Sequence, residues 1–352
     1  MDRYVGLDAH AETCTLAVMS PAGRRLSSQV VETNGESLVE AVRGVPGQVH
    51  LCLEEGTQSA WLHEILEPHV FELVVMVPPK SRGSKDDLRD AWSRANDLRV
   101  GTIETRVFKG PKHFAALRHA ATAYRMATQD VVRAKNRLKS VFRARGISTQ
   151  GEVYGERGRP KRLALLPAGP RDLAEWLYKE LDVLVPLRAE AEERLLTEAR
   201  CHPITRKLKT APGLGPLRTA QLVAIVMTPH RFRTSRQFWS YCGLAVITHS
   251  SSDWVRSPTG AVVRGRVQQT RGLTRKRQPV LKEIFKGAAT TVITQMGDHP
   301  LCVNYYRQVN KGMRPHLAKV TLARRIAAIV LTMWKHEEVY DPTRVTVVTD
   351  NT

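Results

Sequence analysis

The sequence contains no hydrophobic run that approaches the ~20 residues needed to span a bilayer. It opens with MDRYVGLDAH, an acidic start that does not resemble a secretory signal, so we expect neither a membrane segment nor an export signal. Its five cysteines are odd in number and include no CxxC pair: Cys14, Cys52, Cys201, Cys242 and Cys302. This pattern argues against a disulfide framework or a zinc ribbon and favours a reducing, cytoplasmic setting.

The chain has no internal repeat and no low-complexity tract, and its 352 residues suggest two or three domains. Hydrophobic residues make up 42% of the sequence, which excludes a disordered polycation because such chains have too few apolar side chains to bury. We therefore expect a folded protein with a core large enough to need no disulfide or metal for its stability.

Acidic residues are scarce in most of the chain. Residues 1–100 contain 10 Lys+Arg and 15 Asp+Glu, for a net charge of −5, whereas the remaining residues have a net charge of +25. Between Pro203 and His336 there are 23 basic residues and three acidic ones. An acidic N-terminal part and a basic C-terminal part predict that the first contains a cluster of carboxylates and that the second binds phosphates, most often those of nucleic acid.

The first hundred residues show the alternating pattern of an α/β domain. The expected order is three strands, a helix, a strand, a helix, a strand and a helix, over Tyr4–Asp8, Thr13–Ser20, Leu26–Glu32, Gly35–Arg43, Val49–Glu54, Ser59–Leu66, Glu72–Val77 and Lys85–Val100. This is the order of the ribonuclease-H-like fold, in which the first and fourth strands are neighbours, although other α/β folds share parts of it.

Two long helices are predicted next, over Phe114–Ala144 and Arg171–Arg200, on either side of a Gly-rich polar loop. They indicate an antiparallel coiled-coil hairpin that serves as a spacer or an oligomerisation arm. The expected division is therefore a catalytic domain over 1–110, the helical hairpin over 111–202, a basic, mostly α-helical domain over 203–340 and a tail over 341–352.

The basic domain begins with APGLGPLRTAQLVAIV, a Pro/Gly turn that leads into an apolar helix. This pattern is typical of a helix-hairpin-helix element, in which Gly213 and Gly215 would let backbone N–H groups approach a phosphate, but it is equally typical of a plain turn. A helix around Ser235–Cys242, a loop from Leu244 to about Gln278 and two further helices, Pro279–Ile293 and His316–His336, are expected to follow.

Four carboxylates are candidates for a metal site. Asp8 lies in the first predicted strand, Glu54 ends the fourth, and Asp87 and Asp90 are one helical turn apart. Such a group would repel itself unless it held Mg²⁺ or Mn²⁺, and two ions about 4 Å apart suit phosphoryl transfer. The alternative is that these carboxylates bind no metal: Glu54 would then be a solvated residue at a strand end, and Asp87 and Asp90 would be acidic residues in a first helical turn, where the helix dipole favours them. Spacing alone also leaves Asp86 and Asp97 as substitutes.

A serine cluster, Thr248-His249-Ser250-Ser251-Ser252-Asp253, stands before a run of cations. Taken alone, these hydroxyls are more typical of a turn than of a nucleophile or a phosphate donor. The cations that follow support the nucleophile, because they can stabilise a pentacoordinate phosphate. No His/Asp partner is identifiable by spacing, so a hydrolase triad is not supported.

These motifs together resemble the DEDD transposases of the insertion sequence one-ten family, which includes Piv-like invertases and bridge-RNA-guided recombinases. The similar segments are YVGLDAH, LCLEEGTQSAWL, SKDDLRDA, APGLGPLRTAQLVAIV, FRTSRQFWSYCGL, THSSSDWVR and the closing KGMRPHLAKVTLARRIAAIVLTMWKH. The turn after Glu54 departs from the commoner Ala-Thr-Gly, which leaves Glu55 as a weaker candidate.

The resemblance implies a RuvC-like domain in which Asp8, Glu54, Asp87 and Asp90 bind Mg²⁺ or Mn²⁺. It also implies a serine that forms a covalent phosphoserine link with DNA. The motif maps to Ser251, with Ser250 as the alternative, because Ser252 stands where the family has glycine. The implied partners are donor and target DNA, a structured guide RNA and further copies of the chain in a dimer or tetramer.

The nucleic-acid contacts are expected from two basic stretches and the glycine turn: Arg133, Lys135, Arg137, Lys139, Arg143, Gly213, Gly215, Arg256, Arg264, Arg266, Arg271, Arg275, Lys276 and Arg277. Two other functions fit the same residues. One is a RuvC-like, structure-specific nuclease that uses water as its nucleophile, and the other is a non-catalytic nucleic-acid-binding protein.

Overall fold

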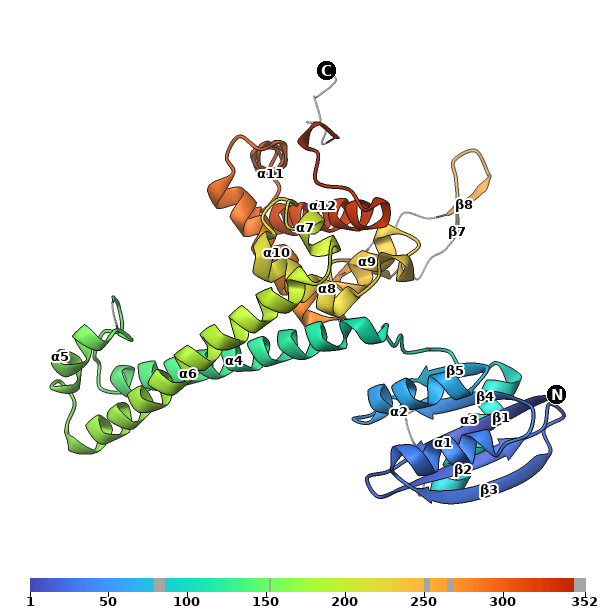
Figure 1. Cartoon of the computed structure of the whole chain (residues 1–352). Helices are drawn as coiled ribbons and strands as arrows, with labels where there is room; N and C mark the ends of the chain where they lie inside the picture. Colours follow the sequence, from blue (N-terminus) through green and yellow to red (C-terminus); the bar gives the residue numbers. More distant parts are fainter. Residues whose placement is uncertain (79–85, 152, 250–253, 265–268, 276, 345–352) are drawn as a thin grey trace. The chain divides into compact units, whose positions relative to one another are not determined.

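The computed structural model describes residues 1–78, 86–151, 153–249, 254–264, 269–275 and 277–344. The chain forms two compact units, Met1–Lys112 and His113–Thr352 (Figure 1). Within the described ranges, no helix is both long enough and apolar enough to cross a membrane.

The first unit is built on a five-stranded sheet with the order β3-β2-β1-β4-β5. Its strands are β1 (Asp2–Ala9), β2 (Thr13–Met19), β3 (Arg25–Glu32), β4 (Gln48–Glu54) and β5 (Glu72–Met76). The first three strands are antiparallel, whereas β4 runs parallel to β1 and β5 parallel to β4. The predicted element order is confirmed, as is the prediction that the first and fourth strands are neighbours.

Helices cover both faces of the sheet at β1, β2 and β4, whose side chains are buried on both faces, whereas the edge strand β3 is mostly exposed. On one face, α1 (Gly35–Arg43) and α2 (Ser59–Leu66) pack against a cluster that contains Val5 and Leu7. On the other face, α3 (Asp87–Val100) packs its Ala91 and Ala95 against β2.

Gly6 sets the distance between α3 and the centre of the sheet. An added Cβ at Gly6 would lie 1.9 Å from the carbonyl oxygen of Ala91 and 2.7 Å from the amide nitrogen of Ala95. Only glycine allows the helix backbone to approach the strand this closely. Because side chains alternate along a strand, Asp8 lies on the same face as Gly6 and therefore faces α3.

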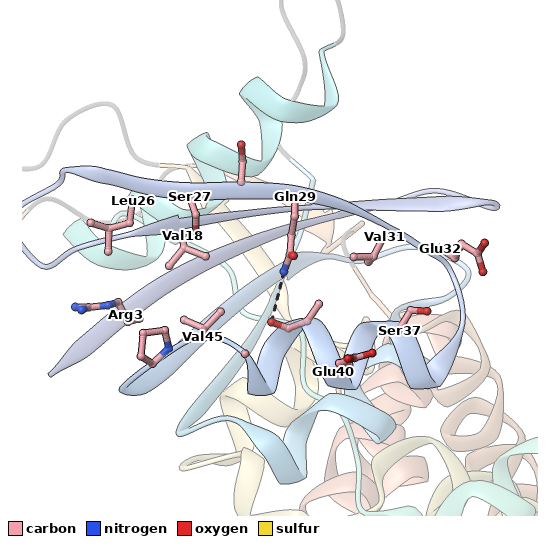
Figure 2. Close-up of a pocket in the computed structure, with 14 residues that line it drawn as sticks. Arg3, Val18, Leu26, Ser27, Gln29, Val31, Glu32, Ser37, Glu40 and Val45 are labelled. Atoms are coloured by element: carbon pink, nitrogen blue, oxygen red, sulfur yellow. Dashed lines mark hydrogen bonds between the residues drawn. The ribbon is translucent and has the colours of Figure 1, made fainter.

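A cavity of about 640 Å³ lies on the opposite face of the sheet, between β3 and α1 (Figure 2). The amide of Gln29 donates a 3.5 Å hydrogen bond across it to the carbonyl oxygen of Ala41. Val18, which belongs to the same apolar cluster as Val5 and Leu7, contributes to its wall. The cavity is therefore separated from Asp8 by the sheet.

The second unit begins with a helical hairpin formed by α4 (Ala115–Arg143) and α6 (Ala168–Arg200), which run side by side (Figure 1). Leu138 and Phe142 of α4 pack with Leu177 of α6 near the tip, whereas Leu117 and Leu195 share a core at the base. This pairing makes the two helices antiparallel. Between them lie η3 (Glu156–Gly158) and α5 (Arg159–Leu163).

The rest of this unit is mostly helical, as predicted. Its helices are α7 (Ile204–Leu208), α8 (Gly215–Val226), α9 (Ser235–Tyr241), α10 (Pro279–Gln295), α11 (Pro300–Asn310) and α12 (Pro315–His336). Their core includes Leu222, Phe238, Phe285 and Ile326 and is continuous with the base of the hairpin. Single 3₁₀ turns occur at η1 (Glu67–His69), η2 (Lys112–Phe114), η4 (Pro229–Arg231) and η5 (Pro342–Arg344).

The loop predicted from Leu244 to Gln278 is wrong in part, because it contains four short strands. They are β6 (Val246–His249), β7 (Trp254–Arg256), β8 (Val262–Arg264) and β9 (Gln269–Leu273), paired as β6–β9 and β7–β8. Strands of three to five residues carry too little hydrophobic alternation to stand out in the sequence. The helix α7, with five residues, was missed for the same reason, and the 11-residue helix α11 was also not predicted.

We predict that Gly6→Ala lowers the stability of the first unit by about 1–3 kcal/mol or more, because the new methyl group collides with backbone that cannot rotate away. The measurement is the thermal unfolding midpoint of the full chain. Gly56→Ala is the matched control, because an added Cβ there meets nothing within 4 Å. Equal midpoints for the two variants would show that the contact between Gly6 and α3 does not set this distance.

Candidate functional site

Two carboxylates come from the adjacent carboxyl ends of β1 and β4. The parallel register pairs Leu7 with Leu53, so Asp8 and Glu54 are the next residues of the two strands. Asp8 is buried, at 8% exposure, and the side chain of Glu54 is 29% exposed. The sheet therefore places a buried and a half-buried carboxylate at one edge.

The third and fourth carboxylates belong to α3, which begins at Asp87. Asp86 is its N-cap, because the Asp86 side chain accepts hydrogen bonds from the backbone N–H groups of Leu88 and Arg89. Asp97, near the other end of α3, accepts a 3.1 Å hydrogen bond from the Thr102 hydroxyl. These bonds give structural roles to the two aspartates that spacing left as substitutes.

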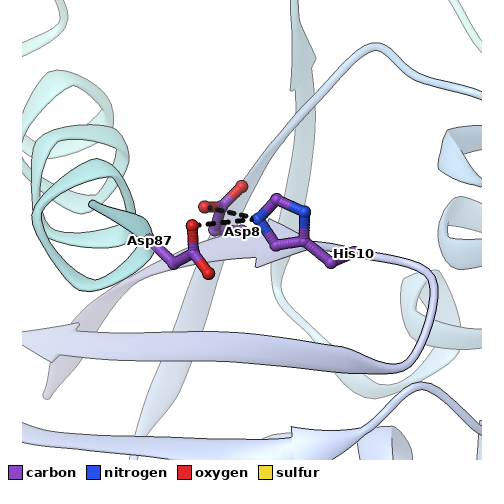
Figure 3. Close-up of side chains that lie close together, drawn as sticks. All are labelled: Asp8, His10 and Asp87. Carbon is purple, nitrogen blue, oxygen red and sulfur yellow. Dashed lines mark ion pairs between the residues drawn. The ribbon is translucent and has the colours of Figure 1, made fainter. Parts of the chain in front are cut away.

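Asp8 and Asp87 meet around the imidazole of His10 (Figure 3). His10 Nε2 lies 3.3 Å from Asp8 Oδ2 and 3.1 Å from Asp87 Oδ1. One donor atom from each of the three residues lies within 4.8 Å of the others, as a metal site requires. Sequence reasoning missed His10, although a histidine two residues after a strand-end aspartate is on the same face as that aspartate.

Arg94 connects this group to Glu54. Its Nη2 atom lies 2.8 Å from Glu54 Oε1 and 3.2 Å from Asp8 Oδ1. Asp90 lies on the same face of α3, between Asp87 and Arg94, and its carboxylate is outside the three-residue group. Asp8 and Asp87 thus lie in one group with His10, and the guanidinium of Arg94 links Glu54 to Asp8.

Two neighbouring groups have partners or surroundings outside the Asp8, His10 and Asp87 group. Glu55 pairs with Lys109 and accepts a 2.9 Å hydrogen bond from Ser59. Burial raises the pKa of the Cys52 thiol to about 12, and this thiol lies in the apolar cluster of Val74, Met76 and Leu98. The candidate donors that remain are carboxylate oxygens and one imidazole.

The donor set fits a divalent ion. Carboxylate oxygens suit Mg²⁺ and Mn²⁺, and the burial of Asp8 limits competition from bulk water. An imidazole nitrogen is accepted less readily by Mg²⁺, which takes oxygen ligands, than by a transition ion. The presence of His10 therefore favours Mn²⁺ over Mg²⁺ in this group.

Two protein-family models match the chain. A DEDD transposase model of the IS110 group matches residues 5–144, and a model described as the transposase IS116/IS110/IS902 family matches residues 205–306. The first match contains every carboxylate discussed above. The chain belongs to the IS116/IS110/IS902 family of transposases.

Two curated relatives are similar to this transposase along most of their length. A protein of Pseudomonas aeruginosa described as a family 20 transposase is 23% identical over 82% of this chain and 84% of its own. A protein of Sinorhizobium fredii described as transposase y4pF/y4sB is 23% identical over 77% of this chain and 68% of its own.

The predicted basic residues of the hairpin lie along α4 of the transposase, and each has a partner within the chain. Arg137 pairs with Glu180 at 3.2 Å, and Arg143 donates to the Thr149 hydroxyl. The three others are Arg133, which pairs with Asp130, and Lys135 and Lys139, which lie over the ring of Tyr154. The charges of Arg133 and Arg137 remain available at the surface, because their side chains are about 60% exposed and salt bridges of this exposed kind are weak.

The two predicted glycines of the turn before α8 have different surroundings. Both have positive φ angles, 72° for Gly213 and 64° for Gly215. An added Cβ at Gly213 would lie 2.3 Å from the carbonyl oxygen of Ala288 in α10, whereas nothing lies within 4 Å of one at Gly215. Gly213 is therefore required for helix packing, and Gly215 has open space beside it.

The remaining predicted residues lie near the short strands. Arg256, Arg264 and Arg271 belong to β7, β8 and β9, and Arg275 and Arg277 are exposed before α10. Ser250, Ser251, Arg266 and Lys276 lie outside the described residues.

We predict that Mn²⁺ stabilises the transposase against thermal unfolding and that Asp87→Asn weakens this effect. Ligand binding to the folded state adds about 2.7 kcal/mol at 100 times the dissociation constant. A tenfold loss of affinity in the variant would remove about 1.4 kcal/mol of this. Asp97→Asn, on the same helix, is the control and should respond to Mn²⁺ as the wild type does. The same Mn²⁺ response in Asp87→Asn and wild type would exclude Asp87 as a ligand.

Proposed function

We propose that this transposase cuts and rejoins DNA at a divalent-metal centre in a ribonuclease-H-like, RuvC-like domain. The observation that carries the proposal is the convergence of Asp8 and Asp87, which are distant in sequence, on one imidazole at the edge of the sheet. The strand order, with three antiparallel strands followed by two parallel additions, supports the assignment of the fold. Glu54 and Asp90 complete the DEDD set.

The carboxylates of Asp8 and Asp87 and the imidazole of His10 would hold Mg²⁺ or Mn²⁺. When bound, the ion neutralises developing negative charge on the oxygens of a phosphodiester. Burial and the contact with Arg94 restrict the carboxylate of Asp8, and α3 fixes the backbone position of Asp87. These residues would hold the ion without rearrangement of the fold.

We assign the nucleophile to Ser251, with Ser250 as the alternative, on the resemblance of THSSSDWVR to the family motif. The serine oxygen forms a bond to phosphorus as the bond between that phosphorus and a deoxyribose oxygen breaks, and the released oxygen becomes a hydroxyl by taking up a proton in place of the one that the serine loses. The phosphoserine ester keeps the energy of the broken bond. A DNA hydroxyl then attacks the ester, which restores the serine and joins the strands without ATP.

The proposed partners are donor DNA, target DNA and a structured guide RNA, whose backbones would contact the basic residues of α4 and of the segment from Arg256 to Arg277. Phosphate contacts of this kind position nucleic acid, while base pairing with the guide would read sequence. Apolar side chains exposed along α6, among them Leu173, Trp176 and Val183, favour assembly of the hairpin in a dimer or tetramer. The expected location is the cytoplasm, with association with the nucleoid during recombination.

We predict that Ser251→Ala abolishes the covalent protein–DNA adduct and lowers strand exchange by at least 10³-fold, because no other group replaces the attacking oxygen. If the nucleophile is Ser250, the loss appears in Ser250→Ala instead. The adduct is measured as a DNA-dependent shift on a denaturing gel. Ser257→Ala is the control, since the Ser257 hydroxyl is exposed and bonds to that of Thr259.

Cleavage that persists in the variant lacking both serines would show that water is the nucleophile, as in a structure-specific nuclease. Unchanged strand exchange in Asp8→Asn would contradict the metal centre itself. The two results are separable, because the first removes the covalent adduct and the second concerns every phosphoryl-transfer step.

A further inference from the structure

Arg94 is a charged side chain buried inside the acidic centre. The residue is 5% exposed, and its Nη2 atom lies 2.8 Å from Glu54 Oε1 and 3.2 Å from Asp8 Oδ1. A guanidinium at this depth is unusual for a residue that normally keeps its head group in water. Its position therefore depends on the two carboxylates that it contacts.

The remaining polar atoms of Arg94 are not satisfied. Its Nε and Nη1 atoms are buried and, among the described residues, have no hydrogen-bond partner. Burying N–H donors without partners is costly, so a role in packing alone would be served better by an apolar residue. The charge of the guanidinium, rather than its shape, explains why an arginine stands here.

The geometry divides the carboxylate of Asp8 between two neighbours. Asp8 Oδ1 faces Arg94, and Asp8 Oδ2 faces His10, which in turn contacts Asp87. One oxygen of Asp8 is thereby committed to an internal cation, and the other faces the group that can bind metal. Glu54 Oε1 is committed to the same cation.

We propose that Arg94 is a permanent counter-ion for Asp8 and Glu54, so that the centre takes one divalent ion, between Asp8, His10 and Asp87, and not two. A guanidinium does not lose its proton in proteins, so it cannot become neutral to admit a second ion. It would repel an ion bound to Glu54 at short range and with little solvent screening. Arg94 acts as a positioning residue, and its role rests on the metal centre proposed above.

The test is the number of Mn²⁺ ions bound per chain by the full-length protein, measured by calorimetric titration at moderate salt and by electron paramagnetic resonance. We expect one ion for the wild type and for Arg94→Lys, which keeps the charge. We expect two for Arg94→Met, with an exchange-coupled spectrum, because two ions in one such site lie about 4 Å apart. We also expect the first ion to bind at least tenfold more tightly in Arg94→Met.

The matched control is Arg99→Met, since Arg99 is on the same helix and bonds to Asn96 and to the Pro21 carbonyl oxygen, away from the carboxylates. It should bind one ion. Two coupled ions in the wild type, or a single ion in a folded Arg94→Met variant, would overturn the proposal. The wild-type result decides the matter even if Arg94→Met does not fold. Absence of Mn²⁺ binding by the wild type would instead overturn the metal centre, and with it this inference.

Discussion

The close approach of α3 to β1 is the contact on which the candidate site depends. Gly6 allows the backbone of α3 to touch the strand, and every other side chain at that position would hold the helix away. Asp8 lies on the same face of β1 as Gly6. Asp87 is the first residue of α3, the helix that Gly6 allows to approach the strand. A displacement of α3 by the width of a methyl group would therefore separate the residues that can hold a metal ion.

The same packing explains why a buried charge is tolerated. Arg94 belongs to α3, the helix that also places Asp87 near Asp8. Its guanidinium contacts Asp8 and Glu54 where β1 and β4 end. Acidic side chains in close proximity repel one another, and a fixed cation among them reduces that repulsion before any ion binds. The guanidinium of Arg94 thus neutralises part of the negative charge of the acidic centre, which reduces the number of divalent ions that the centre can bind.

Much of the fold was predictable because its elements have strong hydrophobic periodicity. The alternation in β1 and β4 and the long apolar stripes of α4 and α6 are read directly from the sequence. The short strands from β6 to β9 could not be predicted from the sequence. Each has at most five residues, and each forms only by hydrogen bonding to its partner strand. Asp8, Glu54 and Asp87 could be singled out as chemical groups, but the roles of His10 and Arg94 depend on the packing of α3 against the sheet, which no local pattern encodes.

We propose that this packing creates a metal centre at Asp8, His10 and Asp87. Anomalous diffraction from crystals of the transposase soaked in Mn²⁺ tests it most directly, because the signal identifies the ion and its position together. We expect one strong peak within ~2.3 Å of donor atoms of these three residues. A peak on other carboxylates of the first unit, with none between Asp8 and Asp87, would contradict it.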